Sequence, residues 1–426
     1  MPTIASVLFS AWFLLPFLAA YASKGLVPLL IGLALLGLAL PETRNRLKSH
    51  PLGTEALLFL PFFFWAGLTV FWSLDSGRAL KVWLTVLGVL LAGRCLVAGM
   101  AALRQFRPER AVLVVLLVGV ALTALMAMEN SVEGVVIKWL KGDAGRGVDD
   151  FHAWLNAGNN ILAIIAWPTV WAADLWAKGR FNGWAARLVA PALFVLIFGV
   201  LAWGLPTAPP LALALSAFVF LVLRYLGTKA LIPIAVLLVA GVLFYPYALD
   251  VLMFSHNRDE TIAYDKVGSL GAWSHRWAIW EFTFKNILTH PVIGWGLDSS
   301  RFIPGGRETA FHGYGELMPL HPHSSFLQVW LELGGIGALL MAGFLGGLLM
   351  KLRRPLVQAS AEMRGVIAFR LATVSVYMCI GLLSFGIWQN WWLATGLLSL
   401  GLLGLVGGPG PLSKAVQSAS NPEKSA

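Results

Sequence analysis

HPHSSFLQVWLELGGIG, residues 321–337, is the stretch from which the rest of the fold can be worked out. A polar segment with two histidines leads directly into a long apolar run. Pro322 favours an extended conformation at His321 and disfavours a helix that starts earlier. His323 or Ser324 is therefore predicted to occupy the N-cap region of the following helix. We expect a membrane helix whose polar first turn lies in the headgroup layer.

The composition extends this interpretation to the whole chain. Hydrophobic residues make up 58% of the 426 positions and charged residues only 12%, whereas soluble domains contain about 25% charged residues. Twelve apolar runs approach the ~20 residues that a helix needs to cross a bilayer. We predict an all-α, polytopic membrane protein with about twelve transmembrane helices. The runs lie near 4–22, 25–41, 56–74, 80–100, 111–129, 158–176, 184–204, 207–223, 230–249, 324–349, 366–387 and 390–407.

The distribution of charge gives the predicted orientation. Basic residues cluster between alternate runs, and on a twelve-helix thread these clusters all fall on the side that the positive-inside rule makes cytoplasmic. The net charge of +10 is then a topological bias, so no nucleic-acid partner is expected. The clusters lie near 44–48, 104–110, 178–187, 224–229 and 351–364. The predicted organisation is transmembrane helices 1–9 in 1–249, a periplasmic loop at 250–322, helices 10–12 in 323–407 and a disordered cytoplasmic tail at 408–426.

Histidine concentrates on the opposite, external side. Seven of the eight histidines fall there, and His50 is the exception. Because imidazole titrates near neutral pH, we expect proton chemistry on this side. His323 is the candidate base, since the positive end of the helix dipole favours a neutral imidazole and a nearby anion. The alternative is that His323 only caps the helix or bonds to the loop.

The long external loop also contains a predicted amphipathic helix. Trp273, Trp277, Trp280 and Phe284 recur at helical spacing, and we expect this helix to lie on the outer membrane surface with its rings at headgroup depth. Arg276 lies beside the stripe, and a guanidinium group donates parallel hydrogen bonds to phosphate. The alternative is an interfacial arginine that extends into water.

The earlier external loop, residues 130–157, supplies further candidates. Lys138 and Arg146 are cations suited to phosphate, or else simply solvated. Asn159 and Asn160 are predicted to cap the sixth helix, with sugar hydroxyls as the alternative ligands. The chain contains no nucleotide-binding loop, metal motif or paired cysteines, so no cofactor and no metal are expected. We also expect no acidic residue in the middle of a helix, which argues against proton-driven transport.

Three local motifs occur in the chain. They are His323-Ser324, nine residues, then Gly334-Gly335-Ile336-Gly337; Ser274-His275-Arg276-Trp277 followed by Gly294-Trp295-Gly296; and Asn156 to Ala163. Together they resemble the motifs of the O-antigen ligase family, whose superfamily also contains O-antigen polymerases. The similarity in layout covers most of the chain. One departure concerns the turn into the eighth helix, where relatives usually carry a Ser-Arg pair and residues 204–210 contain no arginine. Arg146, Lys138 and Arg301 are the candidates to supply that charge.

The resemblance implies a GT-C-like glycosyltransferase of the bacterial inner membrane with a periplasmic active site. The donor would be polysaccharide on undecaprenyl pyrophosphate and the acceptor the lipid A-core. His323 would be the base of a metal-independent inverting transfer, and Arg276 would stabilise the pyrophosphate. Two alternatives are an O-antigen polymerase on the same carrier and, in a different class, a flippase or transporter of lipid-linked oligosaccharide. The candidate substrate contacts are Arg146, Lys138, Arg301, Asn159, Ser324 and Trp277.

Overall fold

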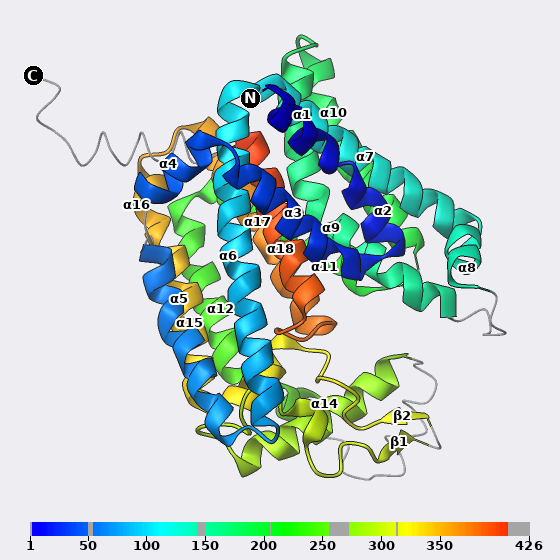
Figure 1. Ribbon diagram of the computed structural model, residues 1–426, viewed down its shortest axis with the longest axis vertical. Helices are drawn as coiled ribbons and strands as arrows, with labels where there is room; N and C mark the ends of the chain where they lie inside the picture. The colour runs from blue at the N-terminus through cyan, green and yellow to red at the C-terminus, as the bar shows by residue number, and fades with distance from the viewer. Residues whose placement is uncertain are drawn as a thin grey trace, which may run out of the picture.

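The computed structural model describes residues 2–49, 54–142, 150–204, 206–254, 272–311 and 314–407. The predicted tail at 408–426 lies outside these ranges, as does Arg146. Nearly all of the described chain is helical (Figure 1). The helices are α1 (Pro2–Ala11), α2 (Leu14–Tyr21), η1 (Ser23–Gly25), α3 (Leu26–Leu38), α4 (Pro41–Ser49), α5 (Thr54–Leu68), η2 (Thr69–Trp72), α6 (Ser76–Phe106), α7 (Pro108–Ser131), α8 (Val135–Lys141), α9 (Asp150–Lys178), α10 (Trp184–Trp203), α11 (Ala208–Leu226), α12 (Thr228–Leu249), η3 (Asp250–Phe254), α14 (Ala272–Thr289), η4 (Ser300–Phe302), α15 (Ser325–Lys351), α16 (Arg353–Val357), α17 (Ala361–Leu383) and α18 (Asn390–Gly407).

The prediction of a polytopic membrane protein is confirmed. Within the described ranges, eleven helices are long and apolar enough to cross a membrane, or twelve if one bent pair forms a single span. That pair is the predicted second span, which ends early at Leu38 and turns by 92° into α4. Pro41 begins α4, as expected for a residue that disfavours helix immediately before itself. The 13 residues of α3 reach only about 20 Å at 1.5 Å per residue, less than the ~30 Å hydrocarbon layer.

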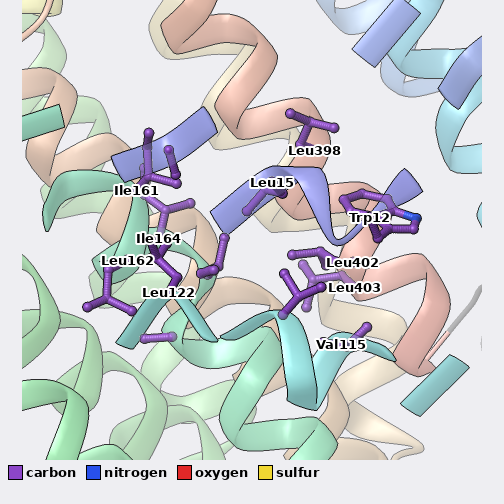
Figure 2. Close-up of a cluster of buried hydrophobic side chains, with 14 of the residues drawn as sticks. Trp12, Leu15, Val115, Leu122, Ile161, Leu162, Ile164, Leu398, Leu402 and Leu403 are labelled. Carbon is purple, nitrogen blue, oxygen red and sulfur yellow. The ribbon is translucent and has the colours of Figure 1, made fainter. Parts of the chain in front are cut away.

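Two large hydrophobic clusters hold the helices together. The first joins α2, α3, α7, α9 and α18 around fully buried side chains such as Trp12 and Leu162, and Figure 2 shows part of it. The apolar part of α9 is 83% buried, so this helix runs through the middle of the cluster. The second cluster joins α5, α6, α12, α14 and α15. The polar residues at 321–324 precede α15 and so lie at one edge of the second cluster.

The two ends of the bundle differ in character. Figure 1 shows the N-terminus, α4 and α16 toward one end, and α14 with the β1–β2 hairpin at the other. We call these the basic end, after Arg44, Arg46 and Lys48 on α4, and the histidine end, after His321 and His323. The hairpin pairs β1 (Thr309–Phe311) with β2 (Tyr314–Glu316) in antiparallel fashion.

Trp280 and Phe284 of the predicted aromatic stripe on α14 face the protein, which corrects the sequence prediction for these two rings. Trp280 is 3% exposed and Phe284 is also buried, both within the second hydrophobic cluster. The indole N–H of Trp280 donates a 2.9 Å hydrogen bond to the Pro322 carbonyl. The stripe therefore buries its apolar area against α15 and the segment before it, and not against lipid headgroups. This contact joins Arg276, one turn earlier on α14, to the histidine segment.

The helix α15 is broken at Gly334, where φ is 68° and ψ is −169°. The segment 291–296 docks into this break through four backbone hydrogen bonds. In two of them, Trp295 N–H donates to Leu331 O at 2.9 Å and Gly335 N–H donates to Pro291 O at 2.8 Å. The others join Gly296 N to Glu332 O and Ile336 N to Val292 O. The two glycine motifs noted in the sequence are thus the two sides of one backbone contact.

Substitution at this contact is expected to be severe. A Cβ atom at Gly294 would lie 2.4 Å from the carbonyl carbon of Glu332, and one at Gly334 would lie 2.3 Å from the Val292 oxygen. Both glycines also have positive φ. We predict that Gly294→Ala and Gly334→Ala each destabilise the protein by more than about 2 kcal/mol. The matched control is Gly199→Ala, because nothing lies within 4 Å of the new Cβ. Thermal unfolding in detergent measures the effect, and equal stability of all three variants would contradict it.

Candidate active site

A buried carboxylate organises the part of α15 nearest the histidines. Glu332 is fully buried, and the expectation of no acidic residue inside a helix is therefore wrong. A carboxylate is tolerated here because it is saturated with hydrogen bonds. Its sequence signal was a Gln328–Glu332 pair one helical turn apart in an apolar run. The donors are Asp298 N at 2.8 Å, Ser300 N at 3.4 Å, Ser300 Oγ at 2.5 Å, Gln328 Nε2 at 2.9 Å and Trp388 Nε1 at 2.6 Å.

His323 lies directly before α15 in an uncommon backbone conformation. Ser324 is the N-cap residue, and its hydroxyl accepts a 3.5 Å hydrogen bond from Leu327 N–H, which confirms the predicted N-cap region. The φ angle of His323 is 52°, a left-handed value that costs energy for a residue other than glycine. Such strain persists only where surrounding contacts enforce it, and it often accompanies a functional role.

His321 is held by hydrogen bonds at both ring nitrogens. Its Nδ1 accepts from the backbone N–H of His323 at 3.1 Å, so the ring proton must be on Nε2. That nitrogen lies 2.6 Å from the side-chain amide of Gln389, whose buried Oε1 is otherwise without a partner. With the amide turned so that Oε1 accepts from Nε2–H, both groups are satisfied. Burial lowers the pKa of His321 to about 3. This imidazole is neutral and fully engaged, so it positions its neighbour.

The ring of His323 has the opposite arrangement of protons. Its Nδ1 lies 3.1 Å from the carbonyl oxygen of Ser384, which can only accept, so Nδ1 carries the proton and Nε2 carries a lone pair. In the part of the chain that the structure describes, no group bonds to Nε2. Burial lowers the pKa of His323 to about 4, the Ser384 hydrogen bond opposes this, and the charge of Arg276 adds to the lowering. At neutral pH, Nε2 is therefore available as a base.

Arg276 and His323 lie at the same end of the molecule and influence each other. The guanidinium group of Arg276 is close enough to depress the pKa of His323. Arg276 is itself partly buried, and burial lowers its pKa. The neighbouring His275 donates a 2.9 Å hydrogen bond from Nε2 to the carbonyl oxygen of Glu316, which connects α14 to the β-hairpin. The arrangement places a fixed positive charge beside a neutral imidazole.

His321, but not His323, borders a cavity of about 620 Å³. His321 and Arg301 both line it, and the charge of Arg301 contributes to the lowered pKa of His321. Arg301 contacts Asp298 at 3.5 Å, and the same carboxylate pairs with Arg78 at 2.6 Å. Arg78 was not among the residues predicted from the sequence, because it lies far along the chain from Arg276, Arg301 and the histidines.

The remaining predicted site residues occupy different settings. Trp277 follows Arg276 on α14 and packs against the second hydrophobic cluster. Ser324 is fully buried by its capping role. Lys138 lies on α8, which packs on α7 and α9. The structure therefore brings Arg276, Trp277, Arg301 and Ser324 to the histidine segment.

The predicted capping role of Asn159 and Asn160 is wrong. The helix α9 begins at Asp150, so both residues lie in its third turn. Asn160 instead donates to Asn156 O at 2.8 Å. Asn159 is 2% exposed, and neither its amide nitrogen nor its amide oxygen has a partner within the described chain. In this structure its amide does not face solvent, where a sugar hydroxyl could reach it.

The segment that holds the candidate site is similar to known proteins. Residues 192–342 match the family model described as O-antigen ligase, a segment that includes Arg276, both histidines and Glu332. One relative is a Rickettsia conorii protein whose name marks it provisionally as a polysaccharide ligase. It is 27% identical over 255 residues, which are 59% of this chain and 57% of the relative. A similarly named Rickettsia felis protein is 28% identical over 293 residues, which are 67% of this chain and 65% of the relative.

The chain thus aligns with less than two thirds of the length of these relatives. The matched family segment nevertheless contains the broken helix, the buried carboxylate and the histidine pair. With the polytopic helical fold, this match and these relatives make the chain similar to the O-antigen ligase family in the segment that holds the candidate site.

Proposed function

We propose that this protein transfers O-antigen polysaccharide from undecaprenyl pyrophosphate to a sugar of the lipid A-core, on the periplasmic face of the bacterial inner membrane. The match of residues 192–342 to the family model described as O-antigen ligase supports the reaction class, and the names of the relatives agree with it. The observation that carries the proposal is the unoccupied Nε2 of a neutral His323, with Arg276 beside it. That pair provides a base and a fixed cation at one place.

The proposed reaction is one inverting displacement. Nε2 of His323 takes the proton of the acceptor hydroxyl, while its oxygen forms a bond to the anomeric carbon of the donor sugar. The bond from that carbon to the diphosphate oxygen breaks, and Arg276 stabilises the negative charge that develops on the diphosphate. Base catalysis of this kind contributes roughly 10²–10⁴-fold. The diphosphate is already a good leaving group, so the proposed step requires no metal or nucleotide.

Glu332 does not favour the transporter alternative, although it is an acidic residue inside a helix. Its oxygens accept hydrogen bonds from five donors, so the carboxylate is committed to holding neighbouring segments. A proton-coupled transporter needs an acid that exchanges its partners as it loads and releases protons. The contacts of Glu332 are those of a structural anchor.

Removal of the His323 imidazole tests the proposed base. We expect His323→Ala to lower transfer between purified lipid-linked polysaccharide and lipid A-core by at least about 10²-fold, because the acceptor then loses its proton to water. Expression and thermal stability should stay close to those of the wild type. His290→Ala is the matched control, since His290 is an exposed histidine that lies against Trp295 at the same end.

The same assay separates the alternatives. A polymerase would lengthen the carrier-bound glycan without making lipopolysaccharide. A flippase would move lipid-linked sugar across vesicles even with alanine at position 323. Transfer by His323→Ala at the wild-type rate would contradict the assignment.

The lowered pKa of His323 determines the expected pH dependence of the reaction. Because the pKa of His323 is lowered to about 4, the imidazole of the free enzyme stays neutral from pH 8 down to about pH 5. We expect kcat/KM for the acceptor to be nearly constant over this range and to fall only as the pH approaches the lowered pKa. An ordinary histidine base would lose half its activity near pH 6.5. An acidic limb centred at or above pH 6.5 would show that the imidazole is not held in its buried, neutral form.

A further inference from the structure

The cavity beside His321 has a wall of positive charge that the proposed reaction does not use. It lies between η1, the first turns of α6, the segment around Asp298 and the start of α18. Four cationic side chains line it against a single carboxylate, that of Asp298. The cations are Lys24, Arg78, Lys81 and Arg301. The cavity therefore carries an excess of positive charge.

That charge is only partly compensated by the protein. Asp298 pairs with Arg78 and Arg301, yet the Nε of Arg301 is buried and has no acceptor among the described residues. Lys24 and Lys81 are exposed to the cavity mouth, and the structure gives neither an ion pair nor a hydrogen bond within the ranges it describes. Unfilled donors around a cavity indicate an anionic ligand.

The placement of the two cations on α6 is unfavourable, and of the two only Arg78 has an ion-pair partner, Asp298, within the described chain. Arg78 and Lys81 lie at the N-terminus of α6, where the helix dipole favours negative and disfavours positive side chains. Lys24 and these two residues also lie at the histidine end, away from the basic turns that set the orientation of a membrane protein. A cation that is placed against the helix dipole, with no gain in stability to offset it, is typical of a binding site.

The opposite wall of the cavity suits a saccharide. Trp391 offers an aromatic ring, and Asn390 and Gln389 offer amide groups. Sugar rings present both apolar faces and hydroxyl groups, and a site of this composition can contact both. A ligand that fills the cavity would therefore combine sugar with negative charge.

We propose that this cavity binds a phosphate group on the saccharide of the acceptor glycolipid, an inference that rests on the proposed function. Arg276 is the arginine whose charge acts on His323, and in the proposed reaction the diphosphate leaves beside these two residues. The cavity borders His321, whose ring centroid lies 4.6 Å from that of His323. The positive charge of the cavity therefore lies beside the reacting bond and not at it. A phosphate on a neighbouring acceptor sugar would lie in this cavity.

The test uses the full-length protein with two acceptors, intact lipid A-core and the same lipid after chemical removal of its core phosphates. In the double variant Lys24→Gln/Lys81→Gln, we expect the KM for the intact acceptor to rise roughly three- to tenfold, with kcat within about twofold of wild type, because the lost contacts bind the ground and transition states alike. For the dephosphorylated acceptor, variant and wild type should give the same KM. Lys285→Gln is the matched control, since Lys285 is an exposed lysine on α14 that pairs with Glu281.

Three outcomes would overturn the inference. They are an equal rise in KM for both acceptors, a rise in the KM for the lipid-linked donor instead, and no change for either substrate. The proposed function is tested separately by the wild type. If the wild type transfers nothing to lipid A-core, the function is wrong, whereas normal transfer without dependence on acceptor phosphate contradicts only the role of the cavity.

Discussion

The docking of residues 291–296 into the break of α15 is the contact on which the rest of the site depends. At Gly334 the helix leaves its regular path, and the Leu331 and Glu332 carbonyls accept hydrogen bonds from Trp295 and Gly296. The backbones approach so closely that a side chain at Gly294 or Gly334 would overlap the opposite chain. An unpaired backbone group inside a membrane protein is costly, so the break requires its partner segment.

A series of hydrogen bonds connects this contact to the two histidines. The docked segment leads into Asp298 and Ser300, whose donors surround Glu332. The same carboxylate holds Trp388, and Gln328 accepts from Ile387 N–H at 2.9 Å. The segment before α18 is thereby immobilised. It provides Ser384 O for His323 and Gln389 for His321, so the two imidazoles are oriented by groups that trace back to one carboxylate.

Much of the fold follows from local sequence signals. The length of the apolar runs identified the membrane helices. Pro322 and Ser324 located the start of α15. Short-range patterns failed where the partner was distant in sequence. The stripe of α14 has the same spacing whether it faces lipid or α15, and the buried position of Trp280 depends on Pro322, 42 residues away. Lys24, Arg78 and Lys81 meet at one cavity only because of how the helices pack.

The central claim is that the fold keeps His323 neutral, with its proton on Nδ1 and a bare Nε2. Nitrogen-15 NMR of histidine-labelled protein in lipid nanodiscs tests this directly, with the His323 signals assigned by their loss in His323→Asn. At pH 7 the account predicts a protonated Nδ1 and an unprotonated Nε2 at His323, and the reverse pattern at His321, both unchanged down to about pH 5. An imidazolium at neutral pH, or a proton on Nε2 of His323, would contradict it.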